Sequence, residues 1–421
     1  MLPDPNSSDK VVLEQGILVI LLLTGLYFPT SINGEHNIAI VVVAFAILFT
    51  ALAFLAGKYG IDLKTAVLIS LPIMIVLTGC TFWGLVSRPF EIDAGLFIKF
   101  CALTLILTLN LRTLRPGPFV EAVFALTNSV NIMGGIAILA GNEWIADFIP
   151  KYYWTSDAGL MPRMLSLHKP VLTFGSHALA GFFLYLFFWV NWERYRSSRS
   201  RLALLFALCY FILLLGVASF SSIMLGFFAV AQMAVCFWRR PSRQMAAIAL
   251  GVAVIIVGLS GFVVSLIDGL SDWPQFAEGV FLNSDMSGPL SRYGPDGVLR
   301  SEVNYLFSHP LSPIGFERCQ STFDVSSPKH FFVGDSGPLE YLVRGSVPLL
   351  FFIYLGLYRF LQRNLLVRTQ ALMLFLVFIT FETGFSVLSA SRTYFLLPFA
   401  IIYLNQTVSV KGVTDVVSFK P

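Results

Sequence analysis

The sequence contains a series of apolar runs, and each run is close to the length with which one helix crosses a lipid bilayer. About 20 apolar residues are needed, because a helix advances only about 1.5 Å per residue. Charged residues make up 12% of the 421 residues, about half of their usual share in soluble domains. The runs lie at residues 15–32, 37–57, 65–86, 94–111, 119–141, 174–192, 202–217, 223–238, 245–267, 338–358, 369–387 and 393–407. The sequence therefore predicts an all-α integral membrane protein of about twelve transmembrane helices, with residues 1–421 as one polytopic domain.

Lysine and arginine residues are concentrated in every second loop of this series. Those loops and the two end segments hold 17 of the 28 basic residues. Because basic loops stay on the cytoplasmic side, we expect both ends of the chain inside and the remaining loops outside. Two of the outer loops are long, at about 142–173 and 268–337. The second is large enough to form a small subdomain outside the membrane.

Five ionisable residues lie inside the apolar runs or at their outer edge, where burying a charge in lipid costs several kcal/mol. They are Lys99, Glu340, Arg344, Glu382 and Arg392. Glu340 and Arg344 are four residues apart, so they share one helix face and can form an ion pair. Lys99 and Arg392 are near the boundary, where snorkelling or a structural ion pair explains them as well as function does. Arg344 and Glu382 are deeper, which favours a functional role.

The outer loops also carry basic residues that the charge rule for short loops does not explain. They are Arg163, Lys169, Arg292, Arg300 and Arg318. Long loops are exempt from that rule, so their excess of positive charge only suggests a function. An anionic ligand at the outer face would account for it, because the planar guanidinium group binds phosphate through two parallel hydrogen bonds.

Several other classes of protein are disfavoured by what the sequence lacks. It has no Asp-x-Asp, His-Glu-x-x-His or Cys-x-x-Cys motif, so no metal site is predicted. The glycines of VGDSG and PIGF are not preceded by a strand or followed by Lys-Ser/Thr, as a nucleotide-binding loop requires. The basic residues form short clusters between apolar runs, which is typical of membrane loops and does not indicate nucleic-acid binding.

Four segments occur in an uncommon order. They are RMLSLHKPVLTFGSHALAGFFLYLFFW (163–189), LRSEVNYLFSHPLSPIGF (299–316), VGDSGPLEYLVRGSVPLL (333–350) and SASRTYFLLPFAIIYL (389–404). In this order, on a chain with about twelve spans and one large outer loop, the set resembles the O-antigen polymerase and O-antigen ligase superfamily of bacterial envelopes. The resemblance covers about residues 160–405.

Two departures from the family pattern bear on which branch is favoured. Ligases carry a His-Asn pair near the end of the large loop, where this sequence has Gly334-Asp335-Ser336-Gly337. The difference favours polymerases of O-antigen, capsule or exopolysaccharide repeats. The superfamily often has a Ser-Arg pair at the start of the eighth span, and SFSSIMLG lacks that arginine.

The resemblance implies a glycosyltransferase of the multi-span type called GT-C, located in the bacterial inner membrane. It would transfer glycan from undecaprenyl pyrophosphate to a sugar hydroxyl at the periplasmic face, without a metal or other cofactor. The outer loops 142–173 and 268–337 are then periplasmic. Its partners would be the lipid-linked oligosaccharide, the bilayer and a chain-length regulator protein. A ligase that transfers glycan to the lipid A core stays an alternative, as does a polytopic transporter or flippase.

The resemblance also suggests roles for particular residues. Cations would stabilise the charge that develops on the pyrophosphate leaving group, and a general base would take the proton of the acceptor hydroxyl. The base candidates are Asp335, His168, His177 and His330, with Asp335 preferred. The substrate-binding candidates are Arg163, Lys169, Arg292, Arg300, Arg344, Arg392, Glu340, Glu382 and Lys99, with Arg163 and Arg300 ranked highest.

Overall fold

The structure is a computed structural model, and it describes most of the chain outside the large loop. The described residues are 5–32, 36–38, 41, 43–44, 47, 60–87, 90–112, 114–153, 164–217, 219–237, 303, 305–308, 313–318, 336–383 and 385–417. The described part is predominantly α-helical.

Helices coincide with ten of the twelve apolar runs. The described helices are α1 (Pro5–Tyr27), α3 (Leu63–Thr65), which continues through a π-helical turn (Ala66–Ser70) into α4 (Leu71–Ser87), α5 (Ala94–Thr108), α6 (Pro118–Leu139), α7 (Glu143–Tyr153), α9 (His177–Ser198), α10 (Arg201–Gly216), α11 (Phe220–Phe237), α16 (Gly337–Asn364), α17 (Arg368–Glu382) and α18 (Thr393–Val417). The run at 245–267 and most of the run at 37–57 lie outside the described residues. Several boundaries shift: α1 begins at Pro5, ahead of its run, α16 continues to Asn364 and α18 continues to Val417.

Some of the described helices have the length and polarity of membrane helices. Three stretches are long and apolar enough to cross a bilayer, namely Leu63–Val86, Pro118–Leu139 and Gly337–Asn364. Shorter apolar helices occur at Glu14–Tyr27, Ala94–Thr108, Arg201–Gly216 and Ser222–Ala234. Many large apolar side chains point outward, including Ile75, Leu126 and Ile212. Such surfaces are costly in water, so the fold is consistent with an all-α membrane protein.

Polar residues before several helices explain where these helices begin. The Asp93 carboxylate accepts a hydrogen bond from the amide of Leu96 at the start of α5. Ser176 caps α9 and Ser200 caps α10 in the same way. Side-chain caps satisfy backbone amides that the first helical turn leaves without a partner. Each cap therefore fixes where an apolar helix leaves the connection before it.

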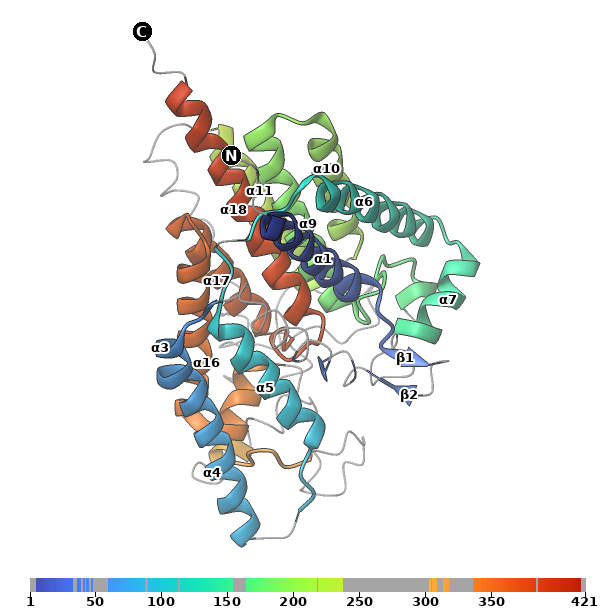
Figure 1. The fold of residues 1–421 in the computed structure, drawn as a ribbon. Coiled ribbons are helices and arrows are strands. Elements are labelled where there is room, and N and C mark those ends of the chain that lie inside the picture. The colour runs from blue at the N-terminus through green and yellow to red at the C-terminus, as the bar shows by residue number, and fades with distance from the viewer. Residues whose placement is uncertain are drawn as a thin grey trace.

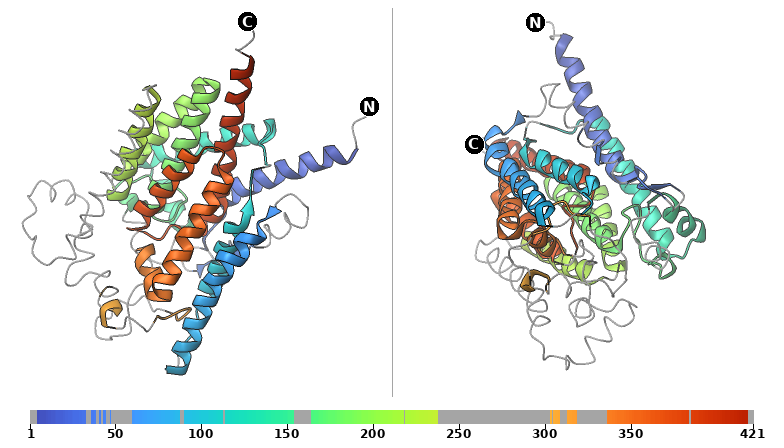
Figure 2. Two further views of the ribbon diagram at one scale, coloured as in Figure 1. Left: turned by 90° about the vertical axis from the view of Figure 1, so that its left-hand side faces the viewer. Right: turned by 90° about the horizontal axis from the view of Figure 1, so that it is seen from below.

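The helices form one bundle in which α9 is central (Figure 1). α9 packs against α10, α11 and α18, and nearly all its side chains from His177 to Glu193 are buried. α16 packs against α17 and α4, while α1 packs against α18 and α6. α1 is inclined across the bundle, whereas α4, α16, α17 and α18 run along a similar direction (Figure 2).

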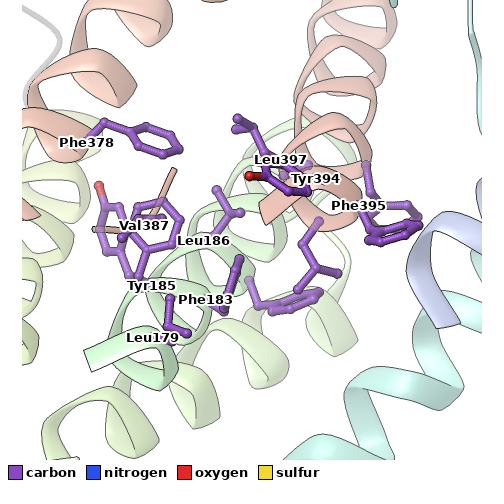
Figure 3. Close-up of a cluster of buried hydrophobic side chains, with 14 of the residues drawn as sticks. Leu179, Phe183, Tyr185, Leu186, Phe378, Val387, Tyr394, Phe395 and Leu397 are labelled. Atoms are coloured by element: carbon purple, nitrogen blue, oxygen red, sulfur yellow. The ribbon is translucent and has the colours of Figure 1, made fainter. Parts of the chain in front are cut away.

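The core between α9, α17 and α18 is aromatic and aliphatic. Figure 3 shows Leu186 of α9 close to Tyr394 and Leu397 of α18, with Leu179 and Phe183 further along α9. Phe378 of α17 lies across from them, and its ring centroid is 4.9 Å from that of Phe182. Interlocking rings provide dispersion contacts, which lipid does not replace equally well.

Two regions differ from the simple arrangement of helices and loops that the sequence predicts. The predicted outer loop 142–173 contains a regular helix, α7. Two short antiparallel pairs also occur: β1 (Ser31–Ile32) with β2 (His36–Asn37), and β3 (Gly60–Ile61) with β4 (Leu109–Asn110). The β1–β2 pair is local, whereas the β3–β4 pair joins segments that are far apart in the sequence, which local hydropathy does not encode.

Candidate functional site

The described residues include eight of the thirteen site candidates. Asp335, Arg163, Arg292 and Arg300 lie outside the described residues, as does His330. The other eight are Lys99, His168, Lys169, His177, Glu340, Arg344, Glu382 and Arg392. Of these, Glu340, Arg344 and Glu382 meet around the first two turns of α16.

Glu340 and Arg344 form the ion pair that their spacing predicts. Arg344 Nε lies 3.3 Å from Glu340 Oε1, and both side chains are buried. Arg344 Nη1 also donates to the carbonyl oxygens of Gly315 and Glu317, at 2.9 and 3.2 Å. A buried charge is tolerated when hydrogen bonds replace its lost hydration. The guanidinium group therefore connects α16 to residues 313–318 of the predicted large loop. We call these residues the 313–318 segment.

α16 is interrupted directly after Arg344. Gly345 leaves the helical conformation, and Ser346 has a φ of 58° with a ψ of −162°, a combination that residues other than glycine rarely adopt. At the break, the carbonyl of Val343 accepts the amide of Ile314 at 3.0 Å, and the carbonyl of Arg344 accepts the amide of Gly315 at 2.9 Å. Unpaired backbone groups cost several kcal/mol within a membrane. The 313–318 segment therefore completes the hydrogen bonding of a broken helix.

The other side of the 313–318 segment packs against α4 and α5. Gly315 has a φ of 54°, and an added Cβ would lie 2.3 Å from Thr81 Oγ1. The amide of Phe316 donates to the same Thr81 oxygen at 2.9 Å. The buried Phe316 ring meets the rings of Phe97 and Phe100 edge-on, with centroids 5.2 and 6.2 Å away. Glycine is required where the backbone touches α4, and phenylalanine fills the space beside α5.

The carboxylate of Glu382 is fully buried at the N-terminal end of α16. Glu382 Oε2 accepts a hydrogen bond from Tyr341 Oη at 3.0 Å, and Oε1 accepts one from the amide of Leu388 at 2.7 Å. A Cβ added to Gly337 would lie 1.8 Å from Oε2, so the backbone of α16 lies directly against the carboxylate. Glu382 thus joins α16, α17 and the turn that follows α17.

Arg392 is buried at the C-terminal end of a helix, α1. Its guanidinium group donates to the carbonyls of Gly25, Leu26 and Phe28, at 2.7, 3.0 and 3.3 Å. The centroid of the Tyr153 ring lies 5.5 Å from the guanidinium carbon. The last turn of a helix leaves carbonyls without partners and is partially negative, so a cation is stabilised there. Capping the end of α1 is a sufficient structural reason for the burial of Arg392.

The connection before α9 carries His168, Lys169 and His177. Three residues of it have positive φ angles, namely His168 (54°), Leu172 (48°) and Gly175 (84°). Lys169 is buried, and burial lowers the pKa of its ammonium group. His168 is exposed, whereas His177 is buried as the first residue of α9. Backbone strain of this kind is found at functional sites, and of the two histidines only His168 has it.

Lys99 lies on α5 and is half-buried. Its backbone carbonyl accepts a hydrogen bond from Tyr394 Oη at 3.2 Å, which joins α5 to the first turn of α18. No group of three histidine, cysteine, aspartate or glutamate side chains that could hold a metal occurs in the described part of the chain.

The sequence did not identify the residues that complete these contacts. The Gly-Phe of the second motif was visible, but its partner Thr81 lies 235 residues before Phe316. Tyr341 reads as an ordinary apolar helix residue, although it donates to Glu382. The available signal was the Gly-Ser-x-Pro stretch after Arg344, because glycine, serine and proline together favour a break in a helix.

Comparisons with known protein families, with curated proteins and with solved structures find no match.

Proposed function

We propose that this protein polymerises the repeat units of a surface polysaccharide, such as O-antigen, capsule or exopolysaccharide. The donor is glycan on undecaprenyl pyrophosphate, and the acceptor is a sugar hydroxyl at the periplasmic face of the inner membrane. In this proposal the chain has twelve spans, both ends in the cytoplasm and a GT-C type of architecture. The order of the four family-like segments between residues 163 and 404 is the observation that carries the proposal.

The contacts of these four segments support a shared location. Residues 314–315 of the second segment pair with the backbone of residues 343–344 in the third. Helix α9, which contains the end of the first segment, packs against α18 of the fourth (Figure 3). Glu382 connects the two pairs, because it contacts Tyr341 of the third segment and the amide of Leu388 just before the fourth.

The proposed reaction is a displacement at the anomeric carbon of the donor. A base takes the proton of the acceptor hydroxyl, whose oxygen bonds to the anomeric carbon while the bond to the pyrophosphate oxygen breaks. Undecaprenyl pyrophosphate leaves with the bonding electron pair, and nearby cations stabilise its charge. We assign the base to Asp335, with His168 and His177 as the other candidates, and the pyrophosphate contacts to Arg163, Arg292 and Arg300.

Arg344 and Arg392 receive a different role in this proposal. Both guanidinium groups donate to backbone carbonyls within the protein. Arg344 fixes the 313–318 segment against α16, and Arg392 fixes the outer end of α1. We therefore propose that they position the substrate-binding segments, with the leaving group held by the loop arginines.

Complementation of a deletion strain tests the proposal. Arg163→Ala and Arg300→Ala should each abolish long glycan chains on a gel while single repeats still reach the cell surface. Arg318→Ala is the matched control, because its ion pair with Glu91 is exposed and an exposed pair contributes little. An unchanged ladder for both variants would refute the roles of these arginines. Loss of single repeats as well would favour a ligase or a flippase.

A further inference from the structure

Helix α7 carries three parallel stripes of side chains, and the members of each stripe are four residues apart. The first stripe is charged and exposed, the second is aromatic, and the third packs against the protein. In that order the stripes are Glu143, Asp147 and Lys151; Trp144, Phe148 and Tyr152; and Ile145, Ile149 and Tyr153. Because residues four apart lie one above the other on a helix, α7 has three distinct faces.

The aromatic face is exposed although it is large and apolar. Trp144 is 71% exposed and Phe148 is 39% exposed. The two rings stack with centroids 5.4 Å apart and an angle of 15° between their planes. The Phe148 and Tyr152 centroids are 4.9 Å apart, so the stripe is continuous along the helix.

α7 lies next to the exposed apolar surface of α6. α7 follows α6 after a short turn and packs against α6 and β1 (Figure 1). α6 is one of the three stretches long enough to cross a bilayer, and Leu126, Val130 and Met133 form part of its exposed apolar stripe. The aromatic face of α7 therefore begins where the exposed apolar stripe of α6 ends, and that stripe is suited to contact with lipid.

We propose that α7 lies in the membrane interface, with Trp144 and Phe148 among the lipid headgroups and the charged stripe in water. A helix in that place has to meet protein, lipid and water at once, and α7 has a matching face for each. Tryptophan and tyrosine favour this depth of the bilayer, because one end of the side chain is apolar and the other is polar. A helix that presented its aromatic rings to a glycan in solution would need only a protein face and a water face.

The anchored helix has a consequence for α1. The amide of Thr30 donates to the carbonyl of Tyr152 at 2.8 Å, and Tyr153 Oη donates to the carbonyl of Tyr27 at 3.0 Å. α7 therefore holds the last turn of α1 at a fixed depth. This inference is independent of the proposed polymerase activity.

Fluorescence quenching by brominated phospholipids tests the proposal. The full-length protein is placed in nanodiscs that contain bromine either just below the headgroups or deep in the acyl chains. Subtracting the spectrum of Trp144→Phe from that of the unmodified protein gives the emission of Trp144. We expect this emission to be quenched at least twofold more by the shallow bromine than by the deep bromine.

Two other tryptophans provide matched controls. Trp83 is exposed on the candidate span that contains α4, so its emission should be quenched by bromine. Trp189 is buried in α9, so its emission should not respond. The proposal is overturned if Trp144 is insensitive to both lipids and is quenched by iodide in the aqueous phase. Protection from iodide by added surface oligosaccharide would then identify a glycan as the occupant.

Discussion

Arg344 and Gly315 are joined by two hydrogen bonds that run in opposite directions. The amide of Gly315 donates to the carbonyl of Arg344 at 2.9 Å, and the guanidinium group of Arg344 donates to the carbonyl of Gly315, also at 2.9 Å. The backbone pair repairs the break in α16, and the side-chain bond gives a buried cation a partner. The contact between these two residues thus explains how α16 accommodates both a buried charge and a break in its helical hydrogen bonding.

We predict that Gly315→Ala destabilises the protein strongly. The added Cβ would meet Thr81 Oγ1 at 2.3 Å and the Thr81 amide nitrogen at 2.6 Å. Its φ of 54° adds a cost of about 1–2 kcal/mol for any residue with a Cβ. The apparent melting temperature of the purified protein should fall by several degrees. Gly79→Ala is the control, since nothing lies within 4 Å of a Cβ there. Equal melting temperatures for the two variants would contradict the contact.

We predict strong coupling between Gly337 and Glu382. Gly337→Ala forces a Cβ against Oε2 of the carboxylate. Glu382→Ala removes the acceptor of Tyr341 and Leu388 and should cost about 1–3 kcal/mol. Because truncating Glu382 also opens space for the new methyl group, the double variant should be more stable than the sum of both effects indicates. Strictly additive melting temperatures would show that the two residues do not touch.

We predict that Arg392→Leu loosens the C-terminal end of α1. Three carbonyls would lose their donor, which should cost about 3 kcal/mol or more. Arg392→Lys should recover only part of the stability, because an ammonium group lacks the planar fork that reaches several carbonyls at once. Protease digestion around residues 28–32, followed by mass spectrometry, measures the loosening. Protection equal to that of the unmodified protein in both variants would exclude the capping role.

A fourth prediction concerns pH and the predicted cytoplasmic end of the bundle. The Thr65 hydroxyl and the Arg363 guanidinium group donate to the Asp62 carboxylate and lower its pKa to about 2. A lowered carboxylate pKa stabilises the fold above the ordinary value, and this gain is lost as the pH falls through the folded value. Asp62→Asn should therefore lower the melting temperature between pH 5 and pH 7, by an amount that corresponds to less than about 1 kcal/mol.

The difference between Asp62→Asn and the unmodified protein should shrink below about pH 4. Arg363→Met should show the same pH dependence, because it removes one of the two side-chain donors to Asp62. A difference that stays constant down to pH 2 would contradict the assignment of this pKa to Asp62.

The sequence predicted the helices well because hydropathy and helix length are local properties. Ten apolar runs became helices, and the spacing of Glu340 and Arg344 correctly indicated their ion pair. It did not reveal that Arg392 and Glu382 complete helix ends, because those ends belong to α1 and α16, which are distant in the chain. The aromatic and charged stripes of α7 were readable, but the whole stretch 142–173 was predicted only as a loop.

The most direct test of the proposed function is reconstitution of the purified protein in liposomes. The substrate is the undecaprenyl-linked repeat unit, isolated from a strain in which the gene has been deleted. We predict longer lipid-linked glycans by mass spectrometry, with one undecaprenyl pyrophosphate released for each repeat added. A polymerase would be contradicted if the purified protein did not elongate the glycan. A transporter would be supported if the same protein restored long chains in cells only by increasing the export of repeats.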